Sequence, residues 1–327
     1  MPARPSAFTD CMLRYIAERM AALFATLVAV SVIIFMLVRL LPGSILDLFF
    51  AGDNTATPEQ MAAAKRQLGI YGSYWDQYVR WISGVVHGDF GKSYLTQQPV
   101  VDIMRTALPI DIELVFLAIS IALLIGIPLG AISAVRRDQP VDYAARVTGL
   151  VGISIPNFWL ATLLLIFTSR VFHWVPPLQY VPFYEDPWKN LQEFILPAIA
   201  ISVFTLAIVT RMVRATMLEV LGLDYVRTAR AKGARRRVVL TKHALRNALV
   251  PVVTVAGFEV GALISAAAIA EIIYGLPGVG YQLLHAIFQR DYPVVQAATL
   301  MIAFVFIVAN FFVDLLYGVL DPRITVT

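Results

Sequence analysis

Residues 112–135 read IELVFLAISIALLIGIPLGAISAV, an apolar stretch with a single charged residue, Glu113. A helix that crosses about 30 Å of hydrocarbon needs roughly 20 consecutive residues that are mostly apolar. The stretch meets both the length and the composition. It therefore predicts a transmembrane helix.

We expect the same structure from five further apolar runs, Ala21–Leu41, Val147–Val171, Phe194–Val209, Val250–Ile273 and Val294–Val319. The 327-residue chain is 59% hydrophobic and 15% charged, whereas a typical soluble domain is about 25% charged. The fourth run is the shortest, but without it the loops on its two sides would fall on opposite faces of the membrane. The sequence thus predicts an all-α integral membrane fold with six transmembrane helices.

Basic residues indicate the side of the membrane, because cytoplasmic segments carry an excess of lysine and arginine. With a cytoplasmic amino terminus, the inside segments hold Arg4, Arg14, Arg19, Arg136, Arg137, Arg146, Arg211, Arg214, Arg227, Arg230, Lys232, Arg235, Arg236, Arg237, Lys242, Arg246 and Arg323. The longer outside segments hold only Lys65, Arg66, Arg80, Lys92, Arg105, Lys189 and Arg290. We therefore expect both termini in the cytoplasm.

This topology divides the chain into a cytoplasmic N-terminal segment (1–20), a transmembrane domain (21–320) and a cytoplasmic tail (321–327). The domain includes an external segment (42–109) and a basic cytoplasmic loop (211–248). The first apolar run is longer than the ~7 to 15 residues of a secretory signal core, so we expect it to be retained as a helix.

Two helices are predicted in the external segment. Thr57 can cap the first helix, with Gln60 as its capping-box partner, and Gly69 can end it after Leu68. The second helix should cover Tyr74–Val86 and stop at Gly88. The later external segment, 174–188, contains four prolines and is expected to be extended.

Several kinds of site are not supported by the sequence. The chain has one cysteine, Cys11, and four histidines without metal-ligand spacing, so we expect no disulfide and no metal site. A Gly-Lys-Ser triplet at 91–93 resembles the end of a phosphate-binding loop, but Val86 stands where its first glycine should be. Any nucleotide chemistry must then come from a partner.

The basic loop contains a more specific pattern. Asp224 can cap a short helix that continues to Lys232, and Gly233 stands where a left-handed backbone can end it. A second helix should begin near Arg235. The small residues Ala229 and Ala231 suit close contact with another protein, whereas a basic loop could equally lie on anionic lipid headgroups. The spacing alone leaves both alternatives open.

Residues 225–233 (YVRTARAKG) and 243–251 (HALRNALVP) resemble the EAA loop of ABC importer permeases of the dipeptide, oligopeptide and nickel class. Further segments are similar to that class in the same order: 39–43 (RLLPG), 77–81 (QYVRW), 88–91 (GDFG), 98–100 (QPV), 126–130 (GIPLG), 155–159 (IPNFW), 271–274 (EIIY), 277–280 (PGVG), 290–293 (RDYP) and 321–323 (DPR). The pattern departs at Arg227-Thr228-Ala229, where Glu-Ala-Ala is general, and at Ser44-Ile45, where Asp-Pro is usual.

The resemblance implies a B-type permease subunit with the transmembrane domain of a type I ABC importer, in a bacterial or archaeal cytoplasmic (inner) membrane. It implies a homologous second permease, two ATPase subunits that bind ATP and Mg, and an extracytoplasmic binding protein that delivers the substrate. The chain itself would catalyse no reaction and hold no cofactor. The implied ATPase-coupling residues are Asp224, Tyr225, Arg227, Ala229, Ala231, Lys232, Gly233 and Ala234.

The substrate is less defined by the sequence. The class serves peptides, nickel, glutathione and opines, and short peptides are favoured here because no histidine or cysteine cluster is present. Asn157, Ser202 and Glu259 are candidates for the translocation path. A different hypothesis is a stand-alone proton-coupled carrier that uses Glu259 and Asp314, since charges within the membrane are costly unless they have a function. The family resemblance instead makes Glu271 and Asp314 structural.

Overall fold

The computed structural model describes residues 5–40 and 57–320, without the side chains of 5–16, 67 and 313–320. Within these ranges all regular structure is helical, apart from one isolated bridge between Lys92 and Pro99. The predicted all-α fold is confirmed. Ser44, Ile45 and the tail 321–327 lie outside the described residues.

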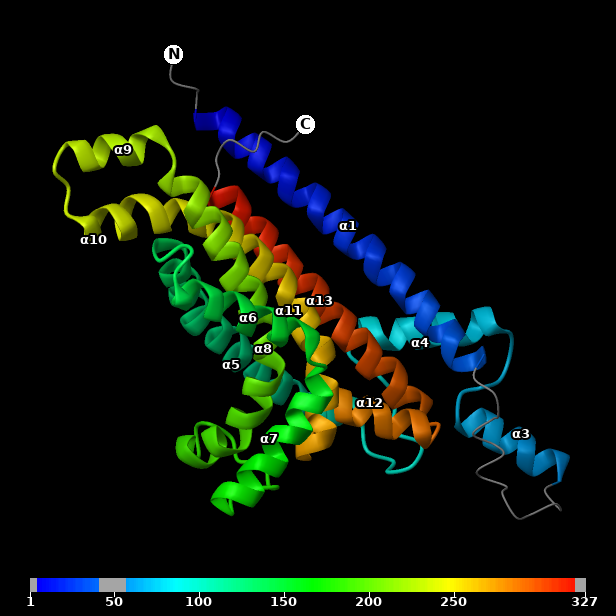
Figure 1. Ribbon diagram of the computed structural model, residues 1–327. Coiled ribbons are helices and arrows are strands. Elements are labelled where there is room, and N and C mark those ends of the chain that lie inside the picture. The colour runs from blue at the N-terminus through cyan, green and yellow to red at the C-terminus, as the bar shows by residue number, and fades with distance from the viewer. Residues whose placement is uncertain (1–4, 41–56, 321–327) are drawn as a thin grey trace. The chain divides into compact units, whose positions relative to one another are not determined.

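The chain forms two compact units, which are coloured along the sequence in Figure 1. The first unit combines Met1–Pro109 with Gly278–Phe311, and the second contains Ile110–Pro277. Within the described residues, five helices are long and apolar enough to cross a membrane, and a bent helix pair supplies a sixth span if it counts as one.

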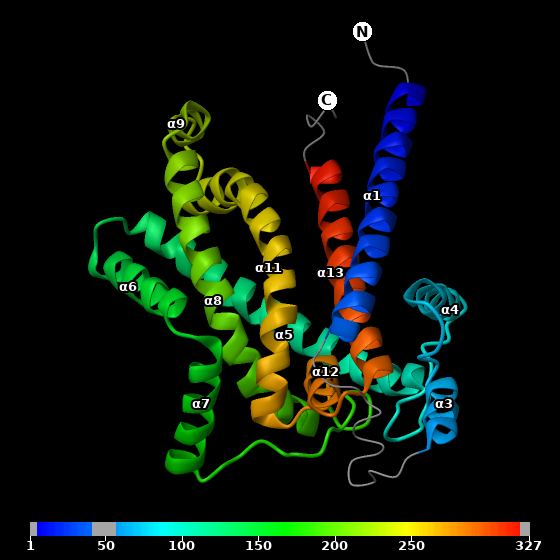
Figure 2. The same cartoon turned by 90° about the vertical axis from the view of Figure 1, so that its right-hand side faces the viewer.

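The helices of the first unit are α1 (Pro5–Leu40), α3 (Pro58–Gln67), α4 (Tyr74–Val86), the start of α5 (Val100–Val135), α12 (Val279–Phe288) and most of α13 (Tyr292–Leu320). Their shared core contains Val38, Met104 and Val295. Helix α4 is seen end-on in Figure 2, beside α1. It contacts α1 through Tyr78, whose ring lies 5.3 Å from that of Phe35.

Both helices predicted within the segment 42–109 are confirmed. Thr57 and Gln60 form the expected capping box at the start of α3, and Gly69 follows this helix with φ +70°. Helix α4 has the predicted bounds, and Gly88 after it has φ +81°. Glycine occupies these positions because its missing Cβ removes the steric cost of a positive φ.

The second unit contains the rest of α5, followed by α6 (Pro140–Ser154), α7 (Asn157–Phe172), α8 (Pro187–Leu221), α9 (Asp224–Ala231), α10 (Arg236–Val238), the π-helix η1 (Val239–Leu245) and α11 (Arg246–Tyr274). Helix α8 is central, because 67% of the residues in its most apolar stretch are buried and α6, α7 and α11 all pack against it. Figure 2 shows α8 beside α11. Glycines on α5 allow a close approach to α8: a Cβ on Gly130 would lie 2.5 Å from the carbonyl oxygen of Thr210.

One predicted span needs correction. The run Val147–Val171 is not one helix but two, α6 and α7, which meet at 105°. Pro156 is the N-cap of α7 and has extended backbone. A proline disfavours helical backbone at the residue before it and cannot donate a hydrogen bond to the preceding turn, so α6 ends before Pro156. The fourth run, Phe194–Val209, lies within a 35-residue helix, α8, despite Pro197 inside it. Residues 174–186 contain no helix, whereas Pro187 and Trp188, which were also predicted to be extended, begin α8.

A buried ion pair fastens α6 to α8. The carboxylate of Asp142 accepts from Arg214 Nε at 2.6 Å and Nη2 at 2.8 Å, from Ser133 Oγ at 2.6 Å, and from the backbone N–H of Asp138 at 3.0 Å. Asp142 is fully buried, and all four donors point at its two oxygens. Burial of a charge is tolerated when the charge is paired and hydrogen-bonded in this way.

Candidate functional site

The predicted docking element is a short helix, α9, that protrudes from the end of α8 (Figure 1). The predicted N-cap at Asp224 is wrong by one residue: Leu223 occupies the extended cap position, and no side chain caps the helix. Asp224 is instead in the first turn, where a negative charge is favourable beside the unpaired N–H groups. It also forms an exposed ion pair with Arg227 at 3.6 Å.

The end of α9 is confirmed at Gly233, which has φ +77°. The N–H of Gly233 donates to the carbonyl of Arg230 at 3.0 Å, and that of Ala234 donates to Ala229 at 3.2 Å. These two bonds form a Schellman motif, which satisfies carbonyls that the helix leaves unpaired. The left-handed glycine thus turns the chain back toward α10.

One side of α9 is fastened to the returning helix. Val226 is fully buried, and the Tyr225 hydroxyl donates to the carbonyl of His243 in η1 at 3.1 Å. Asn247 Nδ2 donates to both groups, at 2.7 Å to the Tyr225 hydroxyl and at 3.1 Å to the His243 carbonyl. These contacts join α9 to η1 and to the first turn of α11.

The other side of α9 is open. Ala231, Lys232 and Gly233 are exposed, while Ala229 and Ala234 are partly buried. This surface offers small side chains and basic groups at the tip of the loop. It leaves space for contact with another protein.

The returning helix contains a feature that the sequence did not predict. A helix begins close to the predicted Arg235, at Arg236, but Val239–Leu245 adopts π-helical geometry before α11 begins. A π-turn widens the helix by one residue and is frequent at functional sites. The sequence carries no periodic signal for it. Asn247, which links Tyr225 to η1, was also missed as a contact residue.

The three predicted path residues lie on three helices. Glu259, on α11, is half-buried and accepts a hydrogen bond from Thr205 Oγ1 of α8 at 3.2 Å. Ser202 lies one turn earlier on α8, fully buried, and donates to the carbonyl of Ile199. Asn157 is the first residue of α7, directly after the break between α6 and α7. The structure thus brings α8 and α11 together at Glu259, whereas Asn157 belongs to a separate element.

Of the two carboxylates that the family resemblance makes structural, Glu271 is described by the structure and Asp314 is not. Glu271 is fully buried near the end of α11, three residues before Tyr274. The Tyr274 hydroxyl donates to the carbonyl of Ala161 at 2.9 Å, which joins α11 to α7. The side chain of Asp314 lies outside the described part of the chain.

Comparison with known proteins identifies close relatives of the sequence. A family model described as "Binding-protein-dependent transport system inner membrane component" matches residues 126–326, and the model for the N-terminal part of such membrane components matches residues 12–115. A putative peptide transport system permease protein of Brucella suis is 39% identical over 96% of this chain and 99% of the relative. The dipeptide transport system permease protein DppB of Escherichia coli K12 is 38% identical with the same coverage.

A solved structure shares the fold at low sequence identity. The inward-facing MetNI methionine ABC transporter matches with a TM-score of 0.54 and 18% identity. The match covers 67% of this chain and 96% of that chain. At this identity the likeness concerns the arrangement of helices alone.

Proposed function

Because the chain belongs to the family of binding-protein-dependent transport system inner membrane components, we propose that it couples a partner's ATP hydrolysis to the import of short peptides. Membership of that family makes it a multi-pass permease subunit of an ABC importer in the inner membrane. The observation that carries the proposed coupling is the protruding helix α9, open on one side and fastened to η1 and α11 on the other.

The contacts support a route for movement within the second unit. A push on the surface formed by Ala229, Ala231 and Gly233 passes through Tyr225 to η1, which continues directly into α11. Helix α11 then acts on α8, where Thr205 holds Glu259. Rigid elements linked in this way can shift as a body between two arrangements, one open to each side.

The partners follow from the same proposal. Two ATPase subunits would bind ATP and Mg and press against α9, with Asp224, Arg227 and Lys232 on its polar surface. A homologous second permease would complete the pathway, and a binding protein would deliver the substrate from outside. The loop and both termini would then lie in the cytoplasm. This subunit would catalyse no reaction itself and would convert the partners' binding energy into a population shift.

Short peptides are the proposed substrate because relatives that are 35–39% identical are named as peptide or dipeptide permeases. Nickel, glutathione and opines are the alternatives within the same machinery. Ser202, Glu259 and Asn157 are proposed to face the path. Their side chains are neutral or acidic, so they offer hydrogen bonds to a peptide backbone or attraction for its ammonium group.

The coupling role is tested at Gly233, where a Cβ would meet no atom within 4 Å. Substitution therefore introduces backbone strain without a clash. Gly233→Val places a β-branched residue at φ +77°, which costs about 1 to 2 kcal/mol. A cost of that size lowers the population of the docking conformation roughly 5- to 30-fold. Peptide uptake by the assembled transporter in proteoliposomes should fall in proportion, while the subunits remain in the membrane.

Two matched variants separate coupling from general strain. Gly233→Asn should retain most of the uptake, because asparagine tolerates a left-handed backbone. Gly88→Val imposes the same strain at φ +81°, also with no atom within 4 Å, but after the end of α4. Uptake that is unchanged in Gly233→Val, or reduced equally in Gly88→Val, would refute the role of the loop.

A further inference from the structure

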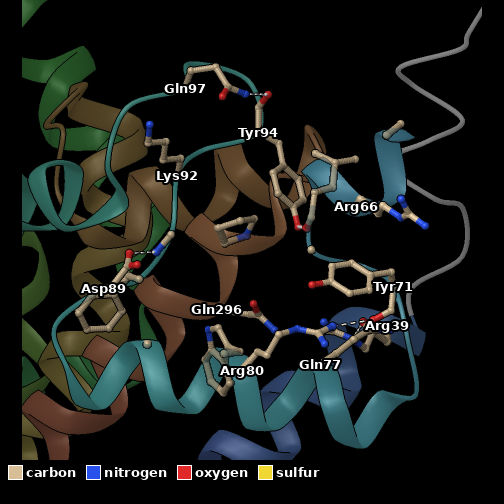
Figure 3. Close-up of a pocket in the computed structure, with 18 residues that line it drawn as sticks. Arg39, Arg66, Tyr71, Gln77, Arg80, Asp89, Lys92, Tyr94, Gln97 and Gln296 are labelled. Carbon is tan, nitrogen blue, oxygen red and sulfur yellow. Dashed lines mark hydrogen bonds between the residues drawn. The ribbon is translucent and has the colours of Figure 1, made fainter. Parts of the chain in front are cut away.

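A cavity of about 520 Å³ in the first unit is lined by four cationic side chains, Arg39, Arg66, Arg80 and Lys92 (Figure 3). Among the described residues that line it, the one carboxylate is that of Asp89, which accepts a hydrogen bond from the backbone N–H of Gly91 at 2.9 Å. Cationic side chains thus outnumber carboxylates in the described lining.

The two central arginines have neutral partners. Arg39 lies over the Phe35 ring at 3.4 Å and donates to Gln77 Oε1 at 3.2 Å and to the Phe35 carbonyl at 3.3 Å. Arg80 donates to the carbonyl of Tyr71 at 2.6 Å and lies over its ring at 4.2 Å. Both guanidinium groups are therefore positioned by neutral groups, while the carboxylate of Asp76, one turn before Arg80 on α4, also attracts the Arg80 charge.

Tyr94, which also lines the cavity, adds no negative charge. Burial raises the pKa of its hydroxyl above the ordinary value, so the phenol stays protonated. The hydroxyl donates to the carbonyl of Leu68 at 2.8 Å. The cavity thus has an excess of positive charge and suits an anion.

An apolar groove of about 430 Å³ adjoins this cavity. It is formed by α1, α4 and α13, with Val28, Val85 and Met301 among its lining residues. Phe90 lines both spaces. Along α4, Trp81 and Gly84 face the cationic cavity, whereas the next residues in the chain, Ile82 and Val85, face the groove.

Along both α1 and α13, the residues that line the cavity lie nearer one end of the helix and the residues that line the groove lie nearer its middle. On α1, Arg39 follows Val28 by 11 residues, which corresponds to about 16 Å along the helix axis. On α13, Gln296 of the cavity precedes Phe304 of the groove by 8 residues, or about 12 Å. The groove therefore extends toward the middle of both spans, while the cationic cavity lies at their ends.

The depth of the cavity agrees with a membrane boundary. Arg39 is the last residue but one of the candidate span Ala17–Leu40. Helix α4 presents Trp75 and Tyr74 as exposed aromatic residues, and such residues are enriched at the level of the lipid headgroups. A cationic cavity at this level and an apolar groove below it match the two ends of a lipid molecule.

We propose that the first unit binds one phospholipid with an anionic headgroup, its phosphate between Arg39 and Arg80 and an acyl chain in the groove beside Val28. Charge complementarity selects the anionic headgroup, and the shared wall at Phe90 lets one molecule fill both spaces. A small anion would use the cavity and leave the groove without a role. The bound lipid would fasten α4 to α1 and α13.

The site is tested with the assembled transporter, delipidated in detergent and reconstituted with mixtures of phosphatidylglycerol and phosphatidylcholine. Phosphatidylglycerol retained after repurification is counted by mass spectrometry. The double variant Arg39→Gln/Arg80→Gln should lower the retained phosphatidylglycerol at least fivefold. Lys65→Gln is the matched control, because it removes an adjacent charge on α3 that does not line the cavity.

A second pair of variants tests the groove without changing charge. Val28→Trp fills the groove and should lower retention by a similar factor, whereas Val32→Trp alters an exposed residue on the same helix outside the groove and should not. Thermal stability of each variant checks that the complex is intact. Retention unaffected by either the charge or the groove variants would overturn the proposal.

A competition experiment distinguishes the lipid from a soluble anion as the occupant of the cavity. Inorganic phosphate or a short peptide that displaces phosphatidylglycerol at millimolar concentration, together with no effect of Val28→Trp, would assign the cavity to a soluble anion and reject the lipid. Equal retention of phosphatidylcholine would also reject it, because the cationic cavity would then have no part in selection.

Discussion

Replacement of Asp142 by asparagine should destabilise the second unit strongly, although the two side chains have nearly the same shape. One carboxylate oxygen accepts from Arg214 Nε and Ser133 Oγ, and the other accepts from Arg214 Nη2 and the Asp138 N–H. An amide puts its NH₂ group against two donors whichever way it is turned. The variant therefore loses the ion pair and two hydrogen bonds without a change of shape.

The magnitude follows from the burial of the pair. Removal of one partner from a buried ion pair costs about 3 to 5 kcal/mol. The Arg214 side chain keeps 21% of its surface exposed and can recover some hydration, so we expect the lower end, about 3 kcal/mol. With ~2 to 4 °C of midpoint shift per kcal/mol in a large domain, Asp142→Asn should lower the unfolding midpoint by roughly 6 to 12 °C.

The assay is a thermal unfolding curve of the purified complex, followed by the fraction that stays monodisperse after heating. Asp138→Asn is the matched control, because Asp138 pairs with Arg137 at 3.2 Å on the surface, with 62% and 65% of their side chains exposed. Exposed pairs contribute at most about 1 kcal/mol, and asparagine tolerates the positive φ of 61° at this position. Its midpoint should shift by less than about 4 °C, given the shift per kcal/mol above.

A double variant tests whether the charge pair itself is responsible. Asp142→Leu with Arg214→Met replaces the pair by apolar groups, which is often neutral for stability when the volume is similar. It should be more stable than Asp142→Asn. If Asp142→Asn shifts the midpoint no more than Asp138→Asn does, the ion pair does not hold α6 to α8.

Three further predictions concern packing, the first unit and the path. Gly130→Ala should lower the free energy of unfolding by about 1 to 3 kcal/mol, since its Cβ would lie 2.5 Å from a backbone oxygen of α8. Gly149→Ala, whose Cβ would have no atom within 4 Å, should raise it by about 0.5 to 1 kcal/mol. Equal heat-inactivation curves for the two variants would contradict this. Asp291→Asn leaves one acceptor oxygen for two donors, Ser93 Oγ and the Tyr94 N–H, and should cost about 1 to 3 kcal/mol and speed proteolysis within 88–99; unaltered cleavage would argue against it. Glu259→Gln should lower peptide uptake several-fold while uptake remains dependent on ATP, and uptake by the chain alone under a pH gradient would favour the carrier hypothesis instead.

Local signals in the sequence predicted local structure well. The capping box at Thr57, the bounds of α4 and the left-handed Gly233 depend on residues within one helical turn of each other, so the chain encodes them without reference to distant parts. The error at Asp224 is of the same local kind. Asp224 and Leu223 compete for the cap position, and burial of Val226 on the inner side of α9 determines the register.

Features that depend on distant residues could not be predicted. Asp142 and Arg214 are separated by 72 positions, and nothing at either position indicates its partner. Hydrophobicity detected the run that contains Pro156, but it does not distinguish a kinked helix from two helices at 105°. The π-turn in η1 has no sequence period of its own, and the hydrogen bonds of Tyr225 and Asn247 became visible only with the fold.

The polar contacts of the second unit explain how a small loop could move a whole set of helices. Three neighbouring pairs of its helices are joined by a side-chain hydrogen bond in a mostly apolar setting: α6 to α8 by Asp142, α8 to α11 by Glu259, and α11 to α7 by Tyr274. Where water is scarce, it competes poorly with such bonds, so they hold. The tight glycine contacts between α5 and α8 leave these two helices little freedom to slide along each other. A displacement of α9 would therefore not be absorbed by bending within the unit. It would turn α6, α7, α8 and α11 together, which is the rigid-body motion that alternating access requires.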